Sequence, residues 1–236
     1  MAIRPFLAMT AAEIRNCTPL PQKVAWMACH FSPYGSGLSN LPHKLPEESL
    51  LVVDDITPIR NHDPEVITHQ LLQCMDSLKI SGILLDFQRP GINETAELVS
   101  YLQNALPCPT AVTEHYAEGI DLPVFLSPVP ASVPLAEHLS SWKGREIWLD
   151  LSLWGETLTL TEDGCNSMPL PPWESGRAGF SEETLLCHYQ ITSKETSAQF
   201  TLWRTEEDLH ALLEEAESLG IRNTVGLYQE LHSIFA

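Results

Sequence analysis

Runs of apolar residues that end in polar ones recur along this chain, and they predict parallel strands. Most runs are continuous rather than alternating, as in sheets that helices cover on both faces. Eight runs are expected to be such strands, at residues 23–31, 50–56, 82–87, 110–113, 123–126, 146–151, 199–203 and 224–228. Eight parallel strands are the number that a (β/α)8 barrel requires.

Helical patterns with recognisable ends separate several of these runs. Asp63 is expected to cap one helix, with proline at its first position, and Asn93 to cap the next. Thr205 caps the clearest helix, and Gly220 ends it. Alternation of strands and helices of this kind predicts the α/β class.

Two segments depart from a regular barrel. Gly, Ser and Pro dominate residues 34–48, which predicts an irregular loop in place of a crossover helix. Between about residues 154 and 197 the pattern turns to short alternating runs: a hairpin arm at 156–161 with a turn at Asp163-Gly164, a Pro-rich linker at 168–173 and a strand at 186–192. We therefore expect one domain over residues 1–236, a TIM-barrel-like (β/α)8 fold with a small antiparallel β insertion at about 154–197.

Composition narrows the function classes. The formal net charge of −18 disfavours nucleic acid and anionic membrane surfaces as partners. The six cysteines are dispersed without C-x-x-C or metal-ligand spacing, which indicates a reducing compartment. No apolar run approaches the ~18 residues that span a bilayer. Residues Thr10 to Glu13 fit a helix capping box better than the cleavage site of a secretory signal peptide. These features predict a cytoplasmic protein.

The segment Ser81-Gly82-Ile83-Leu84-Leu85-Asp86-Phe87-Gln88-Arg89-Pro90 is the most informative in the chain. It resembles the signature strand of glycoside hydrolase family 18, the chitinase family, which carries D-G-x-D-x-D-x-E on its fourth strand, commonly followed by an aromatic residue and proline. The glycine, the last aspartate, the aromatic and the proline match. Ser81 and Leu84 stand in place of the first two aspartates, and Gln88 in place of the glutamate.

The resemblance implies a specific chemistry at these positions. In the family, the glutamate protonates the leaving oxygen while the neighbouring aspartate holds the substrate's acetamido group as nucleophile. The Gln88 amide has no ionisable proton and cannot be a general acid, although it can exchange hydrogen bonds with sugar hydroxyls. Asp86 would then accept hydrogen bonds from a sugar. Asp86 and Gln88 could equally close the strand through backbone hydrogen bonds.

Further carboxylates follow apolar runs and would converge on one mouth of a barrel. They are Asp54, Asp55, Glu114, Asp150 and Glu230. Any one of them alone could be a solvated or loop-capping group. The histidines and acids that could be offered as a metal cluster, His30, His62, Asp63, Glu114 and His115, lack H-x-H or H-E-x-x-H spacing. We therefore predict no metal and no cofactor.

The sequence favours a glycoside-hydrolase-like protein that binds a carbohydrate or another small polar ligand at the C-terminal mouth of the barrel, with catalysis impaired. The ligand-binding candidates are Asp54, Asp86, Gln88, Glu114 and Tyr228. Whether any catalysis is retained is left open. One alternative is an active hydrolase whose carboxylates come from Asp86, Asp150 and Glu230, and another is a non-catalytic interaction protein. Candidate sugar-stacking rings are Trp148, Trp154, Trp173, Trp203 and Tyr228, most of them expected in the core.

Overall fold

The computed structural model describes residues 3–172, 179–194 and 196–235. The chain divides into two compact units, each of which is described by itself. The barrel unit comprises Arg4–Ser127, Gly144–Asp150 and the chain from Asn223 onward. The second unit comprises chiefly Pro128–Lys143 and Leu151–Arg222.

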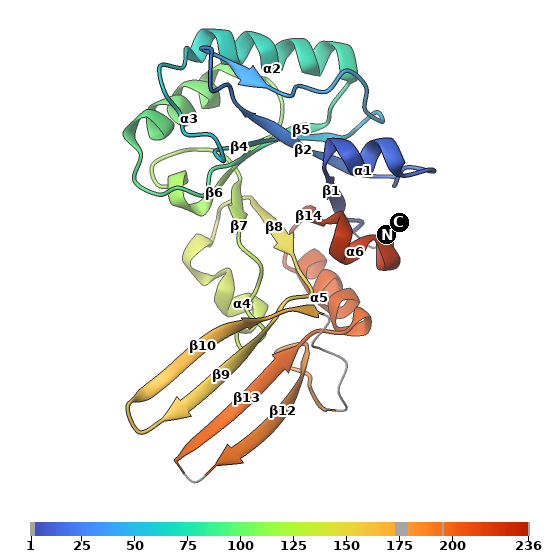
Figure 1. Cartoon of the computed structure of the whole chain (residues 1–236), viewed down its shortest axis with the longest axis vertical. Helices are drawn as coiled ribbons and strands as arrows, with labels where there is room; N and C mark the ends of the chain where they lie inside the picture. The colour runs from blue at the N-terminus through green and yellow to red at the C-terminus, as the bar shows by residue number, and fades with distance from the viewer. Residues whose placement is uncertain (1–2, 173–178, 195, 236) are drawn as a thin grey trace. The chain divides into compact units, whose positions relative to one another are not determined.

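The barrel unit is a closed barrel of eight parallel strands, as the sequence predicted (Figure 1). Each strand pairs with the next around the barrel, and β1 pairs with β2 to close it. The strands, in the order in which they neighbour one another, are β1 (Phe6–Met9), β14 (Asn223–Leu227), β8 (Ile147–Leu151), β7 (Val124–Leu126), β6 (Thr110–Thr113), β5 (Gly82–Asp86), β4 (Leu50–Asp54) and β2 (Val24–Phe31).

One barrel strand escapes the sequence prediction. β1 lies outside the eight predicted runs, yet all four of its residues are buried and it pairs on both edges. Its apolar residues are followed, after Thr10, by the apolar Ala11 and Ala12, so the local pattern does not mark off a strand there. Its inclusion makes Gly82–Asp86 the fourth barrel strand in chain order, after β1, β2 and β4. The Asp86 segment therefore lies on the fourth strand, where family 18 carries its signature.

Helices on the outside of the barrel begin largely where the sequence indicates. α1 (Ala11–Asn16) has a capping box between Thr10 and Glu13, and α2 (Pro64–Leu78) is capped by the Asp63 side chain. α3 (Asn93–Ala105) begins one residue earlier than predicted, because Ile92 is the N-cap and Asn93 is the first helical residue. α2 and α3 lie side by side outside the sheet (Figure 1). The unit also contains η1 (Glu114–Tyr116) and α6 (Tyr228–Phe235).

The connection between β2 and β4 is irregular, as predicted. It contains only the two-residue strand β3 (Leu38–Ser39), which pairs antiparallel with β2. Inside the barrel, alternate residues of each strand pack into one cluster, which includes Val52, Leu84 and Trp148. The residues two positions further along β4, β5 and β8 are Asp54, Asp86 and Asp150, so the inward side of these strands changes from apolar to acidic at the C-terminal end.

Gly82 shows why the fourth strand needs glycine at its start. A Cβ at this position would lie 2.8 Å from the carbonyl oxygen of Pro109 and 3.2 Å from the ring of Trp148. The neighbouring strand and the core tryptophan therefore occupy the space that a side chain would need. Gly82 therefore allows β5 to pair with β6 from Ile83 onward, and this pairing sets the position of Asp86 at the other end of β5.

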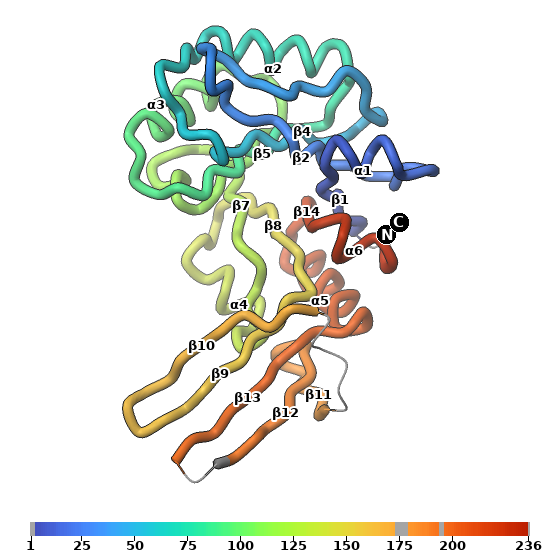
Figure 2. The backbone as a smooth tube through the Cα atoms, viewed as in Figure 1, coloured from blue at the N-terminus to red at the C-terminus, as the bar shows by residue number. Residues whose placement is uncertain are grey.

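The second unit contains a five-stranded antiparallel sheet in the order β10-β9-β13-β12-β11 (Figure 2). Its strands are β9 (Gly155–Thr161), β10 (Gly164–Leu170), β11 (Phe180–Glu182), β12 (Cys187–Lys194) and β13 (Ser197–Trp203). The predicted hairpin with its turn at Asp163-Gly164 is confirmed. That the whole chain is one domain stays a prediction.

Two expectations for this region are wrong. Residues 199–203 belong to β13, which pairs antiparallel with β9 and β12 and is not a barrel strand. Its apolar residues Ala198, Phe200 and Leu202 alternate with polar ones, a pattern typical of a half-buried antiparallel strand. Residues 168–170, read as linker, continue β10. Because a strand of this sheet can contain Pro169 at the edge, proline did not mark a linker here.

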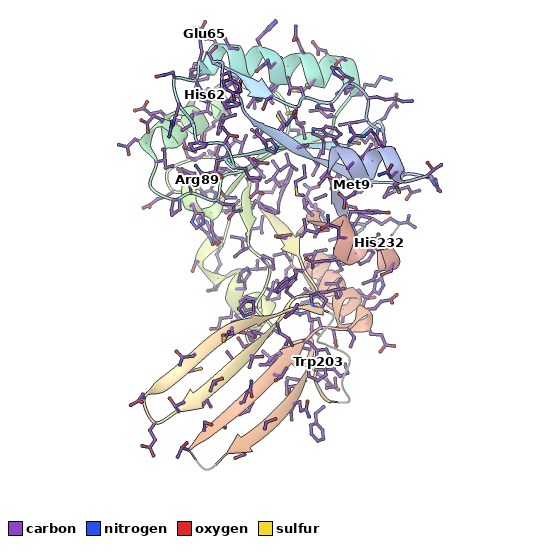
Figure 3. The ribbon with its side chains drawn as sticks, viewed as in Figure 1. Met9, His62, Glu65, Arg89, Trp203 and His232 are labelled. Atoms are coloured by element: carbon purple, nitrogen blue, oxygen red, sulfur yellow. The ribbon has the colours of Figure 1, made fainter. Side chains whose placement is uncertain are left out.

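Helices described in the second unit include α4 (Leu135–His138), η2 (Ser140–Trp142) and α5 (Glu206–Ser218). Thr205 caps α5 through a capping box with Asp208, as predicted. Next to it, the buried Arg204 guanidinium donates hydrogen bonds to the carbonyls of Val129 at 2.6 Å and Pro130 at 3.1 Å. These bonds tie the end of β13, marked by Trp203 in Figure 3, to the segment before α4.

Candidate functional site

Three polar residues form a row across neighbouring strands at the C-terminal end of the barrel. His30 on β2 is paired in register with Asp54 on β4, and Asp54 is paired with Asp86 on β5. Neighbouring parallel strands lie about 4.8 Å apart, so side chains in register on one face are held close together. The row places one imidazole and two carboxylates side by side.

The His30–Asp54 pair occupies one end of this row. His30 Nδ1 lies 2.7 Å from each carboxylate oxygen of Asp54. Asp54 is only 6% exposed, and its carboxylate also accepts the backbone N–H of Ile56 at 3.0 Å. The buried charge of Asp54 is thus satisfied from two sides, and the hydrogen bond fixes the orientation of the imidazole.

Asp55 has a different role, because it holds the loop that follows β5. Its two carboxylate oxygens accept the backbone N–H groups of Gln88 at 3.0 Å and Arg89 at 2.9 Å. It is 5% exposed, so these bonds are shielded from water. Arg89, marked in Figure 3, donates in turn from its guanidinium to the carbonyl of Ile56 at 2.7 Å.

Residues of β6 and η1 hold the same loop from the other side. The Thr113 hydroxyl donates to the carbonyl of Phe87 at 2.7 Å. The Tyr116 hydroxyl donates to the carbonyl of Arg89 and accepts the backbone N–H of Ile92 at 3.3 Å. Because backbone N–H and C=O groups of this loop are hydrogen-bonded, the loop holds the Gln88 side chain in a defined position.

Asp86 and Gln88 are in direct contact, since the Gln88 amide nitrogen donates a hydrogen bond to the Asp86 carboxylate. Burial raises the pKa of Asp86 above its usual range, and the negative charges of Asp54 and Asp55 raise it further. The hydrogen bond from Gln88 acts in the opposite direction and lowers that pKa. The pair therefore offers amide and carboxyl groups to a ligand in a partly desolvated setting.

Two cavities open at this end of the barrel and share Met27, Asp86 and Gln88 in their linings. The larger has a volume of about 800 Å³, in the range of small-molecule sites. Its polar lining includes His30, Asp54, Asp55 and Arg89. The smaller, of about 140 Å³, lies over the barrel core and is lined by Asp150 together with Leu84 and Phe125. Five residues that the sequence indicated line one or both of these cavities: Asp54, Asp55, Asp86, Gln88 and Asp150.

The remaining predicted residues do not line either cavity. Glu114 begins η1 and accepts a hydrogen bond from the Ser127 hydroxyl at 3.1 Å. Tyr228 begins α6, with its hydroxyl 3.4 Å from the Cys17 sulfur, and Glu230 lies two residues further along the same helix. Their roles in binding or catalysis stay predictions.

Of the candidate stacking rings, Trp148 and Trp203 are buried core residues and Trp154 is partly exposed in the second unit. Trp173 lies outside the described residues.

The sequence did not indicate the contacts that His30 and Asp55 make. His30 was considered only as a metal ligand, and Asp55 only as one of several strand-end carboxylates. The available signal was their position at the ends of β2 and β4, but the contacts depend on which strands are neighbours.

Within the described part of the chain, no group of three or more His, Cys, Asp or Glu residues is arranged to hold a metal ion. No helix in that part is both long and apolar enough to cross a bilayer.

Comparison with solved structures finds the same barrel fold in other proteins. The fold is similar to that of a family 18 chitinase from Cycas revoluta, solved as a mutant in complex with (GlcNAc)4, with a TM-score of 0.60, 11% identity and coverage of 98% of this chain and 97% of the other. It is similar to a class V chitinase mutant from Nicotiana tobaccum in complex with NAG4, with a TM-score of 0.62, 9% identity and coverage of 95% and 93%.

The Bacillus cereus spore cortex-lytic enzyme SleL is a further similar structure, with a TM-score of 0.54, 10% identity and coverage of 99% of this chain and 74% of the other. No family model and no curated protein matches the sequence. The chain therefore has a glycoside-hydrolase-like barrel fold that resembles the family 18 chitinases. At these identities the likeness is one of fold.

Proposed function

We propose that this chain binds an oligosaccharide at the C-terminal mouth of its barrel and does not hydrolyse it through the family 18 mechanism. The observation that carries the proposal is the Gln88–Asp86 hydrogen bond at the end of the fourth barrel strand. An amide stands where the resembled family has its proton donor, and an amide has no proton to transfer to a leaving oxygen.

The same residues are suited to binding sugar hydroxyls. The Gln88 carbonyl oxygen can accept a hydrogen bond while its nitrogen donates to Asp86, and Asp86 retains a second carboxylate oxygen. The loop that presents Gln88 is held by Asp55, Thr113 and Tyr116, so little conformational freedom is lost on binding. Two similar barrels were solved in complex with (GlcNAc)4 and NAG4, which suggests (GlcNAc)4 as the first ligand to test.

The proposal is tested by isothermal titration of (GlcNAc)4 into the whole chain and into Gln88→Ala. We expect binding to the native chain and a loss of affinity of about tenfold in the variant, because one or two hydrogen bonds to a desolvated site are removed. Gln73→Ala, at an exposed glutamine on α2, is the matched control. Equal affinities in the native chain and Gln88→Ala would show that the assignment is wrong.

The alternative of an active hydrolase is favoured by one further observation. Asp86 and Asp150 line the same cavity of about 140 Å³, so two carboxylates from different strands face one space. Such a pair could act as acid and base or nucleophile. Hydrolysis of an aryl glycoside that is lost in Asp150→Ala but kept in Gln88→Ala would support this alternative. Absence of both binding and hydrolysis would leave a non-catalytic interaction protein.

A further inference from the structure

A third cavity of the barrel unit lies beside α1 and has a different character from the acidic mouth. Its volume is about 520 Å³, which is large enough for a small ligand. It is lined by α1, the segment after it, one residue of β2 and the segment before β4: Ala11, Ile14, Arg15, Leu20, Trp26, Lys44, Leu45 and Pro46.

The walls of this cavity are apolar and held in place. Trp26 and Leu45 are each only 9% exposed, so both are fixed in the surrounding structure. The polar atom of Trp26 is already satisfied, because its indole nitrogen donates to the carbonyl of Asn40 at 3.0 Å. The ring can therefore contact an apolar ligand without leaving an unpaired N–H group.

The only charged residues in the lining are cations, although the chain carries a net charge of −18. Within residues 3–172, 179–194 and 196–235, neither Arg15 nor Lys44 forms an ion pair or a side-chain hydrogen bond. Two acids close to them in sequence have other partners. Glu13 accepts from Thr10 and from the Gln229 amide at 2.7 Å, and Glu47 is 2.7 Å from Lys79.

We propose that this cavity binds an apolar monocarboxylate of the fatty-acid class. The alkyl chain would displace water from the walls formed by Ile14, Leu20 and Trp26, and the carboxylate would lie between Arg15 and Lys44. The acidic mouth, with Asp54, Asp55 and Asp86, would repel the same ligand. Ala11 and Arg15 also line the larger cavity of the acidic mouth, so the variants that test this proposal are made at Lys44 and Leu20, which line only the cavity beside α1.

The test uses dodecanoate, dodecanol and dodecyltrimethylammonium, each below the concentration at which it forms micelles, in isothermal titrations with the whole chain. The three probes share one alkyl chain and differ in charge. We expect dodecanoate to bind about fivefold more tightly than dodecanol, because exposed cations add a modest charge interaction, and the ammonium probe to bind more weakly than either.

Two variants separate this site from general detergent binding. Lys44→Gln should weaken dodecanoate binding about fivefold and leave dodecanol binding unchanged. Leu20→Trp should weaken both by filling the cavity, provided that its circular dichroism spectrum matches that of the native chain. Lys143→Gln, at an exposed lysine of the second unit, should change neither.

Equal binding of all three probes to the native chain, or an unchanged dodecanoate affinity in Lys44→Gln, would overturn the proposal. Because Lys44 is exposed, its variant is expected to fold normally, so either result is decisive even if Leu20→Trp misfolds.

Discussion

His30 Nδ1 lies 2.7 Å from both carboxylate oxygens of Asp54, and the two residues are paired in register on neighbouring strands. This contact joins β2 to β4 at the rim of the barrel. It keeps a buried carboxylate paired next to Asp86, and it brings a titratable imidazole into the wall of the larger cavity.

Removal of the imidazole should therefore destabilise the barrel. Within the described part of the chain, His30→Ala leaves the buried Asp54 carboxylate with the Ile56 N–H as its hydrogen-bond partner, and we expect a loss of about 1 to 3 kcal/mol in the free energy of unfolding at pH 7. The measurement is urea unfolding. His69→Ala, at an exposed histidine of α2, is the control. The double variant His30→Ala/Asp54→Asn should recover part of the stability that His30→Ala loses. If the loss in the double variant equals the sum of the losses in the two single variants, the two side chains do not interact.

Replacement of Asp86 should make stability less dependent on pH. Its pKa is raised in the folded state, chiefly by burial, so the folded chain binds a proton more tightly than the unfolded chain does. The native chain therefore loses stability as the pH rises from the unfolded pKa of about 3.9 through the raised folded value. Asp86→Asn lacks this loss.

The urea midpoint of Asp86→Asn relative to the native chain should accordingly be higher at pH 8 than at pH 3.5. Asp76→Asn, at an exposed position on α2, should show no such trend. A difference between Asp86→Asn and the native chain that stays constant over this range would contradict the role of Asp86 burial.

The substitution Gln88→Glu should introduce a pH dependence of stability that a solvated glutamate does not give, because the pKa of a solvated glutamate is the same in the folded and the unfolded chain. It puts a second carboxyl group in contact with Asp86, and two carboxylates at that distance share one proton. The pKa of the pair is then raised in the folded state, so stability present at low pH is lost as the pH rises. We expect about 1 kcal/mol less stability than the native chain at pH 8 and none of this loss at pH 4. Gln73→Glu is the matched control, and an equal loss at both pH values would show that the two side chains do not interact.

Asp55 is predicted to hold the Gln88 loop. In Asp55→Asn the amide can accept from one of the two backbone N–H groups but not from both, because its nitrogen is a donor. We expect the Gln88 and Arg89 amides to exchange hydrogen faster and the free energy of unfolding to fall by about 1 to 3 kcal/mol. The amides of α2 provide the internal reference for hydrogen exchange. Unchanged protection of Gln88 and Arg89 would show that Thr113 and Tyr116 suffice to hold the loop.

The sequence by itself determined the local features of this protein. The caps at Thr10, Asp63 and Thr205, the hairpin turn at Asp163-Gly164 and most barrel strands depend on neighbours within a few residues. Periodicity and capping are local effects, so they can be recognised without knowledge of the fold. The acidic ends of β4, β5 and β8 were visible for the same reason.

Tertiary structure alone decided which of these elements meet. The four-residue β1 closes the barrel and makes β5 its fourth strand, while β13 joins a separate antiparallel sheet. The row of His30, Asp54 and Asp86 and the hold of Asp55 on the Gln88 loop depend on strand neighbours and register. Pairing between strands far apart in the chain is set by how their buried faces pack together, and a linear pattern does not encode that packing.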